Sequence, residues 1–468
     1  MESLARTANR GSVSTGYDID YSIKFEADNS EQLYRTPSSD GNMKTWTYSV
    51  WFKRTELGAS QTLIAALDTY MYFETNDTAW LNLRSASTNF FMATNRVFRD
   101  TSAWYHAVIA CDTTDSTAAD RLKLYINGVR ETSFSNNTYE NIDGNDNTGM
   151  NKATVHRIGQ YSNYGSKFSG YMAEANLIDG QALAPTEFGE FDDSGIWKPK
   201  EYTGTYGTNG FYLDFADASD LGDDESGNGN DFTEGGITSI DQATDTPTNN
   251  FCIFNAVQNY TSSTVLSDGG TLWDNPAGQN WQSITGTFAV SSGKWYWEVR
   301  GATYAFLGIA DVEDSIVPQR TDGYYVGHND NGNSKSIGMY SINGQVYNAP
   351  GGSPDGTSYT SSSMIGFALD MDNRKMWISK DGTWISTIGD PTGTPSGGIA
   401  LTNLGDYVYP AVSVSASNGV ICAFGGIVSP HVSHHNMTNT DANGYGAFKS
   451  SPPSGYYSLC TKNLSEFG

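Results

Sequence analysis

The stretch that decides the fold is residues 104–129, WYHAVIACDTTDSTAADRLKLYINGV. Its first eight residues are apolar on nearly both faces, which is typical of a strand covered on two sides. After a polar break, Leu122, Leu124 and Ile126 alternate with more polar neighbours, which indicates a strand with one wet face. Asn-Gly at positions 127 and 128 closes this strand, because a two-residue hairpin turn needs positive φ at both central positions. The stretch therefore predicts an antiparallel β-hairpin.

The same pattern returns in the second half of the chain, at residues 365–384, IGFALDMDNRKMWISKDGTW. A buried run ends in acidic turn residues, and a second alternating run leads to Asp381-Gly382. A chain of 468 residues is also too long for one hydrophobic core. We therefore expect two separate β-domains.

The composition supports an all-β fold class. The chain has 50 glycines, 28 tyrosines, 21 phenylalanines and 11 tryptophans, and it has no sustained helical period. The expected architecture is two antiparallel β-sandwich, or jelly-roll, domains in tandem. We expect an N-terminal arm at 1–20, a first sandwich with an acidic connector at 21–245, a second sandwich at 246–426 and a polar C-terminal tail at 427–468.

Charge and cysteine use exclude several classes of protein. The 52 acidic and 27 basic residues give a net charge of −25, which argues against binding nucleic acid or an anionic membrane through charge. The sequence has neither a secretory h-region nor the ~18 consecutive apolar residues of a membrane span. The expectation is a protein made in a cytoplasm. The cysteines lack the close pairing of zinc sites and are expected to be buried free thiols: Cys111, Cys252, Cys422 and Cys460.

The first 190 or so residues resemble the concanavalin A-like lectin/laminin-G jelly roll. The motifs that carry this resemblance follow one another in the chain: YSIKFEADNSEQLYR, WTYSVWFKR, WYHAVIACD, LKLYINGV and FSGYMAEANLIDGQALAPTEF. The loop DDESGNGNDF is similar to a segment that often opens such domains, although here it follows the closing turn. This placement predicts that residues 211–237 return to the first sandwich.

Residues from about 251 to 426 resemble a SPRY (B30.2-like) sandwich through GKWYWEV, LGIAD, YYVG, MIGFALDMDNRKMWISKDGTW and YPAVSVS. Together with the ending PPSGYYSLCTKNL, the pairing of domains is similar to virion structural proteins of tailed phages of marine bacteria. The resemblance implies a virion protein assembled in the host cytoplasm, which agrees with the missing secretion signal. It implies no particular ligand.

An enzymatic function would need two carboxylates facing a sugar. One Glu-x-Asp-x-x-Glu pattern exists, at Glu26, Asp28 and Glu31, but its intervening residues Asn29 and Ser30 favour a turn rather than a central strand. We therefore interpret the match as chance and expect no catalytic residues.

Calcium is the metal that the sequence favours, because an acidic glycine loop offers hard oxygen ligands. The candidate ligands are Asp223, Asp224, Asn228, Asn230 and Asp231. A solvated turn without an ion is the competing interpretation. His431, His434 and His435 lack a nearby residue that would complete a transition-metal shell, so we expect an exposed tail there.

Surface aromatics are the remaining functional signal, since an aromatic ring can stack on the face of a neutral sugar. Most aromatic residues pack in cores, and the candidates for ligand contact are Trp51, Tyr161, Tyr164, Tyr324, Tyr325 and Trp384.

Three classes of function remain open. The leading expectation is a non-enzymatic tail-fibre or fibre component that binds host cell-surface glycan. It would form a homo-oligomer and contact other virion proteins through its N-terminal arm. A capsid decoration or cement protein, acting by protein-protein contacts, is the first alternative. A polysaccharide-degrading enzyme is the third.

Overall fold

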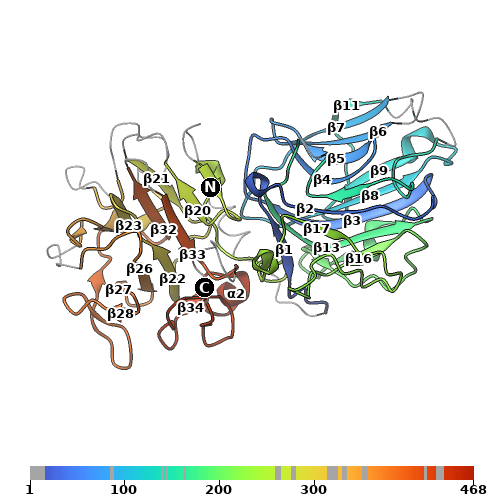
Figure 1. The fold of residues 1–468 in the computed structure, drawn as a ribbon. Coiled ribbons are helices and arrows are strands. Elements are labelled where there is room, and N and C mark those ends of the chain that lie inside the picture. The colour runs from blue at the N-terminus through green and yellow to red at the C-terminus, as the bar shows by residue number, and fades with distance from the viewer. Residues whose placement is uncertain are drawn as a thin grey trace. The chain divides into compact units, whose positions relative to one another are not determined.

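The computed structural model describes residues 16–84, 89–138, 142, 146–162, 165–258, 265–275, 281–313, 325–328, 335–349, 357–415, 419–427 and 437–468. The chain divides between Thr248 and Asn249 into two compact units, the first and the second domain. The sequence places this boundary between residues 245 and 246. Regular structure in both units is nearly all β-strand, so the all-β prediction is confirmed (Figure 1).

The first domain contains two large antiparallel sheets. The β3 sheet has the order β10 (Val129–Arg130), β9 (Leu122–Ile126), β8 (Tyr105–Asp112), β3 (Thr45–Arg54), β13 (Gly170–Asp179), β1 (Ser22–Phe25) and β18 (Gln242–Ala243), and β16 (Phe211–Leu213) also pairs with β13. The β5 sheet has the order β11 (Phe134–Asn137), β7 (Asn89–Val97), β6 (Thr78–Arg84), β5 (Thr69–Phe73), β4 (Gln61–Ala66), β12 (His156–Ile158), β2 (Gln32–Arg35) and β17 (Thr233–Gly235).

The hairpin predicted from residues 104–129 is confirmed. Strands β8 and β9 pair antiparallel, with Ala107 opposite Ile126. At the tight turn that leads from β9 to β10, Asn127 has φ 48° and Gly128 has φ 76°. Gly128 also packs against an indole, because a Cβ there would lie 2.4 Å from the ring of Trp197.

The core lies between the two sheets of the first domain. Phe52 of β3 contacts Phe73 of β5 with ring centroids 5.3 Å apart. Both side chains are completely buried within one hydrophobic cluster that draws on both sheets, including Tyr48 and Met71. Alternate residues of each strand fill this layer, as in a β-sandwich.

Residues 180–206 cover the outer face of the β3 sheet. They include one 3₁₀ turn, Pro185–Glu187. They also include a two-stranded ribbon, β14 (Gly189–Phe191) with β15 (Trp197–Pro199). Phe188 packs on Val108 and Ile178 of the sheet.

Residues 211–237 return to the first domain, as the sequence predicts. Strand β16 pairs with β13, and β17 pairs with β2 at the edge of the β5 sheet. The chain therefore contributes late strands to both sheets of the sandwich before it reaches the second domain.

The second domain also has two large sheets. The β22 sheet has the order β19 (Val265–Ser267), β20 (Leu272–Asp274), β33 (Gly419–Ala423), β22 (Lys294–Arg300), β26 (Met364–Asp370), β27 (Lys375–Lys380) and β28 (Thr383–Trp384), with β31 (Ile399–Ala400) on β27 and β34 (Tyr457–Ser458) parallel to β22. The β23 sheet has the order β21 (Gln282–Thr285), β32 (Val408–Val414), β23 (Ala305–Asp311), β24 (Ser336–Tyr340) and β25 (Val346–Tyr347).

Smaller elements complete the described chain. They are the ribbon β29 (Gly389–Asp390) with β30 (Ser396–Gly397), the helix α2 (Thr461–Phe467), and the 3₁₀ turns Ala27–Asn29, Ala118–Asp120, Ser239–Asp241 and Ala256–Gln258. No helix in the described parts of the chain is long and apolar enough to cross a membrane.

The C-terminal segment differs from the expected surface tail. Residues 437–468 are part of the second domain, where β34 pairs with β22 and α2 closes the chain. Glu298 of β22 is fully buried and accepts hydrogen bonds from the backbone N–H groups of Lys449 at 2.7 Å and Ser450 at 2.9 Å. This long-range contact, which local sequence pattern does not reveal, holds the segment in the fold.

The prediction of buried free thiols is confirmed for all four cysteines. The N-terminal arm lies mostly outside the described residues. From residue 16 onward the chain belongs to the first domain, because the Ile19 backbone exchanges hydrogen bonds with Thr248 Oγ1 at 3.1 and 2.8 Å.

Candidate functional site

Five aromatic side chains form a continuous row on the outer face of the β5 sheet. Ring centroids are 4.5 Å apart for Tyr161 and Tyr70, and 5.5 Å apart for Tyr70 and Tyr72. They are 6.1 Å apart for Tyr72 and Trp80, and 6.5 Å apart for Trp80 and Phe91. Each of the five side chains is partly exposed. We call these five residues the aromatic row.

Strand alternation places the row on the outer face. In β5, Tyr70 and Tyr72 alternate with Met71 and Phe73, which are both fully buried in the core. Successive side chains of a strand point to opposite faces of its sheet, so the two tyrosines must point away from the core. Trp80 occupies the matching position, because it lies opposite Tyr72 on the next strand.

Two buried polar side chains lie within the row. Thr62 of β4 is opposite Tyr72, and Asn82 of β6 is opposite Tyr70, so both point to the face that carries the rings. Thr62 is 0% exposed and Asn82 is 6% exposed. Within the described structure, Thr62 Oγ1 and Asn82 Oδ1 have no hydrogen-bond partner. A buried polar atom without a partner is costly, so each needs an explanation.

Side-chain hydrogen bonds fix two of the rings. The Trp80 indole donates from Nε1 to Thr78 Oγ1 at 3.1 Å. The Tyr72 hydroxyl donates to Glu74 Oε2 at 3.3 Å. The rings are therefore oriented before any ligand arrives, which lowers the entropic cost of binding.

Glu74 places a negative charge beside the row. Its Oε1 accepts from the Thr75 backbone N–H at 3.0 Å and from Ser60 Oγ at 3.2 Å. The hydrogen bond from the Thr75 backbone is the main reason that the pKa of Glu74 lies below its ordinary value. Glu74 is therefore ionised at neutral pH.

The predicted ligand residues of the first domain have three different outcomes. Tyr161 lies at one end of the aromatic row. Tyr164 lies outside the described residues. Trp51 is 5% exposed and is stacked on the imidazole of His106, with centroids 4.6 Å apart, so it is not the surface aromatic that the sequence predicts. The indole of Trp197 also stacks on His106, at 5.9 Å, in the segment that covers this sheet.

In the second domain, Tyr325 belongs to another aromatic cluster. Its ring stacks on Phe306 at 4.0 Å, and Tyr340 stacks on Phe306 at 4.5 Å. Trp281 meets the Phe306 ring edge-on at 5.0 Å. These rings pack mainly on one another, and residues 325–328 form a turn.

The other candidates of the second domain lie apart from this cluster. Trp384 is partly exposed at the end of β28, opposite Ser379. Tyr324 lies outside the described residues, as do His431, His434 and His435.

The acidic loop forms a hydrogen-bonded turn. Asp224 accepts from the backbone N–H groups of Tyr212 at 2.9 Å and Asn230 at 2.8 Å, and from Ser226 through both its N–H and its hydroxyl. The Arg35 guanidinium donates to Asn230 Oδ1. Asp224 thus has four protein donors, which leaves its oxygens poorly suited to a calcium ion.

Three of the four remaining loop residues are also engaged within the protein. The side chains of Asn228 and Asn230 both donate to backbone carbonyls, including that of Gly210 at 3.0 and 2.8 Å. Asp231 accepts from the Asp224 backbone, and Asp223 is exposed. In the described parts of the chain, no three His, Cys, Asp or Glu side chains come together to hold a metal.

The pattern Glu26, Asp28 and Glu31 forms the turn that its intervening residues indicate. Asp28 lies in the 3₁₀ turn Ala27–Asn29. Glu31 is buried and accepts from the Glu26 backbone N–H at 2.6 Å, and burial raises its pKa to about 7. Both glutamates are buried, at 7% exposure for Glu26 and 2% for Glu31.

Comparisons with known proteins identify the two domains. Residues 28–187 match the model of the concanavalin A-like lectin/glucanases superfamily, and residues 294–427 match the SPRY domain model. The first domain is concanavalin A-like and the second is a SPRY domain. No curated protein matches the chain.

Two solved structures align with parts of the chain. The SPRY domain of human HERC1 aligns at 15% identity with a TM-score of 0.27, over 36% of this chain and 96% of that one. A heptameric SAP-like pentraxin from Limulus polyphemus aligns at 19% identity with a TM-score of 0.27, over 36% of this chain and 80% of that one.

Sequence reasoning missed four of the five residues of the row in the concanavalin A-like domain. Tyr70 and Tyr72 lie in β5, Trp80 lies in β6 and Phe91 lies in β7. The available signal was the alternation TYMYF followed by TAWLNL, which puts bulky aromatics on the face opposite the core.

Proposed function

We propose that the protein is a non-enzymatic glycan-binding protein whose concanavalin A-like domain holds sugar on the aromatic row. The observation that carries this proposal is the aromatic row itself. Five partly exposed rings adjoin one another in space, and two polar atoms without hydrogen-bond partners lie among them. Aromatic faces bind the apolar face of a pyranose, and a few placed polar groups fix its orientation.

The electrostatics of the site support binding rather than cleavage. A glycoside hydrolase needs a carboxylic acid whose pKa is raised so that it can protonate the leaving oxygen. Glu74, the carboxylate beside the row, has a lowered pKa because it accepts hydrogen bonds. Glu31 has a raised pKa, yet it is turned into the protein. Neither residue has the properties of a catalytic acid at this face.

We further propose that the protein acts in a phage virion, as an exposed fibre component that contacts host glycan. The tandem order of the two domains supports this, since it resembles tailed-phage structural proteins. Its partners would be other virion proteins, reached through residues 1–20, and copies of itself. A capsid decoration protein is the competing role. The number of copies of this protein per virus particle distinguishes the two roles, because a fibre component is present in few copies and a decoration protein coats the head in many.

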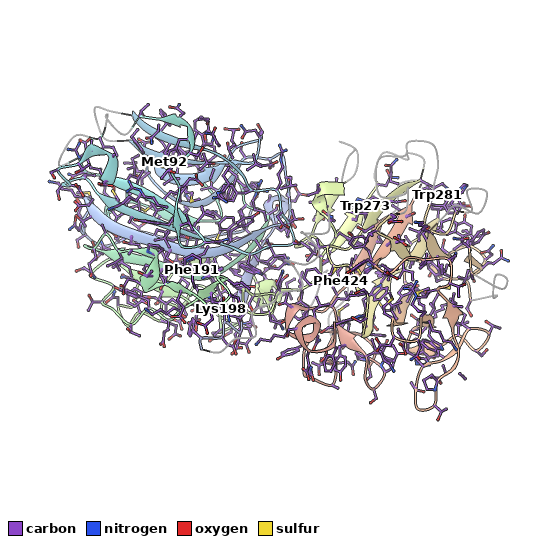
Figure 2. All side chains as sticks on the ribbon, turned by 180° about the vertical axis from the view of Figure 1, so that it is seen from behind. Met92, Phe191, Lys198, Trp273, Trp281 and Phe424 are labelled. Carbon is purple, nitrogen blue, oxygen red and sulfur yellow. The ribbon has the colours of Figure 1, made fainter. Side chains whose placement is uncertain are left out.

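The test of glycan binding is a glycan array probed with the full chain. The Trp80→Ala variant should lose most of the signal, because it removes the largest ring of the row. Phe191→Ala is the matched control, since Phe191 is 51% exposed and lies on the other side of the β3 sheet from Met92 of β7 (Figure 2). Equal binding by wild type and Trp80→Ala would refute the proposed site.

A further inference from the structure

We infer that the aromatic row selects a neutral glycan whose hydroxyl groups pair with Thr62 and Asn82, and that Glu74 excludes acidic sugars. This inference rests on the proposed glycan binding and specifies the class of ligand. Three features of the β5 sheet carry it: the two unpartnered polar atoms, the charge beside Tyr72, and the spacing of the rings.

The unpartnered atoms favour a ligand that supplies hydroxyl groups. Asn82 Oδ1 can only accept a hydrogen bond, and Thr62 Oγ1 can both donate and accept. A sugar hydroxyl does both, so one chemical group satisfies either atom. Thr62 pairs across the strands with Tyr72, and Asn82 with Tyr70, so each polar side chain lies beside a ring of the row. A purely apolar ligand would leave both atoms unpaired.

A second buried threonine of the β5 sheet shows how the protein itself can satisfy such a hydroxyl. Thr94 of β7 is also 0% exposed, but its hydroxyl accepts from the Ala79 N–H at 3.1 Å and donates to the Arg96 carbonyl at 2.8 Å. The same sheet therefore contains one buried threonine that its own structure satisfies and one that it does not. We infer that a bound glycan supplies the hydrogen-bond partner that the Thr62 hydroxyl lacks in the free protein.

The charge beside the row opposes acidic sugars. The Glu74 carboxylate accepts from the Tyr72 hydroxyl at 3.3 Å, so a sugar stacked on Tyr72 would lie close to a negative charge. Arg157 of β12, a cation of the same sheet, pairs instead with Gln32 at 2.7 Å and lies over the Tyr34 ring at 5.8 Å. The Glu74 carboxylate would repel a uronate or sulfate group stacked at Tyr72, and Arg157 is already engaged with Gln32 and Tyr34.

The spacing of the rings favours a chain over a single sugar. Successive centroids are 4.5 to 6.5 Å apart, which is comparable to the length of one pyranose unit. The row crosses from Tyr161, which follows β12, to Phe91 in β7, so an extended glycan can stack on several rings at once. Short oligosaccharides should therefore bind more weakly than long ones.

The first experiment replaces the unpartnered hydroxyl with a methyl group in the full chain. Thr62→Val should keep or raise the melting temperature, because it removes a buried polar atom that has no partner in the free protein. It should weaken the affinity for the best neutral glycan of the array by roughly threefold to tenfold, the value of one hydrogen bond. Thr94→Val is the control and should lower the melting temperature while leaving glycan affinity unchanged.

The second experiment measures charge selectivity at low ionic strength, where screening is weak. The probes are cellohexaose as a neutral chain and hexagalacturonate as an acidic one. Wild type should bind neutral chains and reject hexagalacturonate, and Glu74→Gln should reduce this discrimination at least severalfold. Equal binding of both probes by wild type, or unchanged glycan affinity in Thr62→Val, would overturn the inference while leaving glycan binding intact. If no glycan binds wild type, the proposed function itself fails.

Discussion

The indole Nε1 of Trp197 lies 3.0 Å from Nδ1 of His106, and the indole can only donate. The imidazole must therefore carry its proton on Nε2, which lies 2.8 Å from Ser49 Oγ. Burial also lowers the pKa of His106 to about 3. This serine-histidine pair cannot work as a nucleophile and its base, because the histidine nitrogen that faces the serine is already protonated.

Replacing Trp197 with phenylalanine should destabilise the first domain. The variant leaves Nδ1 of buried His106 without its donor, which should lower the free energy of unfolding by about 1–3 kcal/mol. Urea denaturation checks this. Glycan binding should not change, because the row lies on the other sheet. Unchanged stability would show that this hydrogen bond does not hold residues 180–206 on the β3 sheet.

Replacing Glu174 with glutamine should change how stability depends on pH. Glu174 is 8% exposed, accepts from the Tyr212 hydroxyl at 2.8 Å and from the Tyr17 hydroxyl at 3.0 Å, and has φ 52°. Burial raises its pKa from 4.5 to about 7. A carboxyl whose pKa is raised in the folded state stabilises the fold below pH 4.5, and this contribution disappears as pH rises through 7.

The wild type should therefore lose stability relative to Glu174→Gln between pH 4.5 and 7, by up to about 3 kcal/mol. Comparing the two proteins at each pH cancels the titration of every other group. Thermal denaturation across this range is the measurement. A difference that stays constant with pH would mean that Glu174 titrates normally.

Replacing Glu298 with glutamine should destabilise the SPRY domain. The carboxylate accepts from two backbone N–H groups and from the Tyr296 hydroxyl at 2.9 Å, and burial raises its pKa. Glutamine has one acceptor oxygen, so about 1–3 kcal/mol should be lost. A chain ending at residue 436 should lose far more, because it also uncovers β22. Calorimetry and limited proteolysis measure the stability of Glu298→Gln and of the truncated chain. A truncated chain as stable as the full one would show that residues 437–468 are not an integral part of the second domain.

Chelation should not destabilise the acidic loop. Because Asp224 is already saturated with protein donors, EDTA should leave the melting temperature unchanged, and calorimetry should detect no calcium uptake at this loop. Arg35→Met is the contrasting variant. It removes donors to Asn230 and to the Asn209 carbonyl, and it should lower stability by about 1–3 kcal/mol. A chelator-sensitive melting temperature would restore the calcium interpretation.

Strands and turns of this protein follow closely from local pattern. The Asn-Gly turn and the strand KWYWEVR, which is β22 residue for residue, are specified by alternation and turn chemistry alone. The membership of residues 211–237 in the first domain came from resemblance to a known fold, since their pairing partners lie far away in sequence.

The exposed face of each sheet could not be predicted in the same way. Trp51 and Trp80 both point away from the core on strands of similar pattern, yet Trp51 is covered by His106 and the segment that carries Trp197. Which outer face stays open depends on where a later segment crosses. Glu298 shows the same limit, because its alternation gives no sign of partners more than 150 residues away.

The most direct test of the account is the affinity of Tyr70→Ala/Trp80→Ala for the best neutral glycan, measured by titration calorimetry beside wild type and Phe191→Ala. Each aromatic contact should contribute about tenfold, so the double variant should bind roughly a hundredfold more weakly, with a cooperative melting transition that shows it is folded. Phe191→Ala should match wild type. Undiminished binding by the double variant would contradict the claim that the aromatic row is the glycan site.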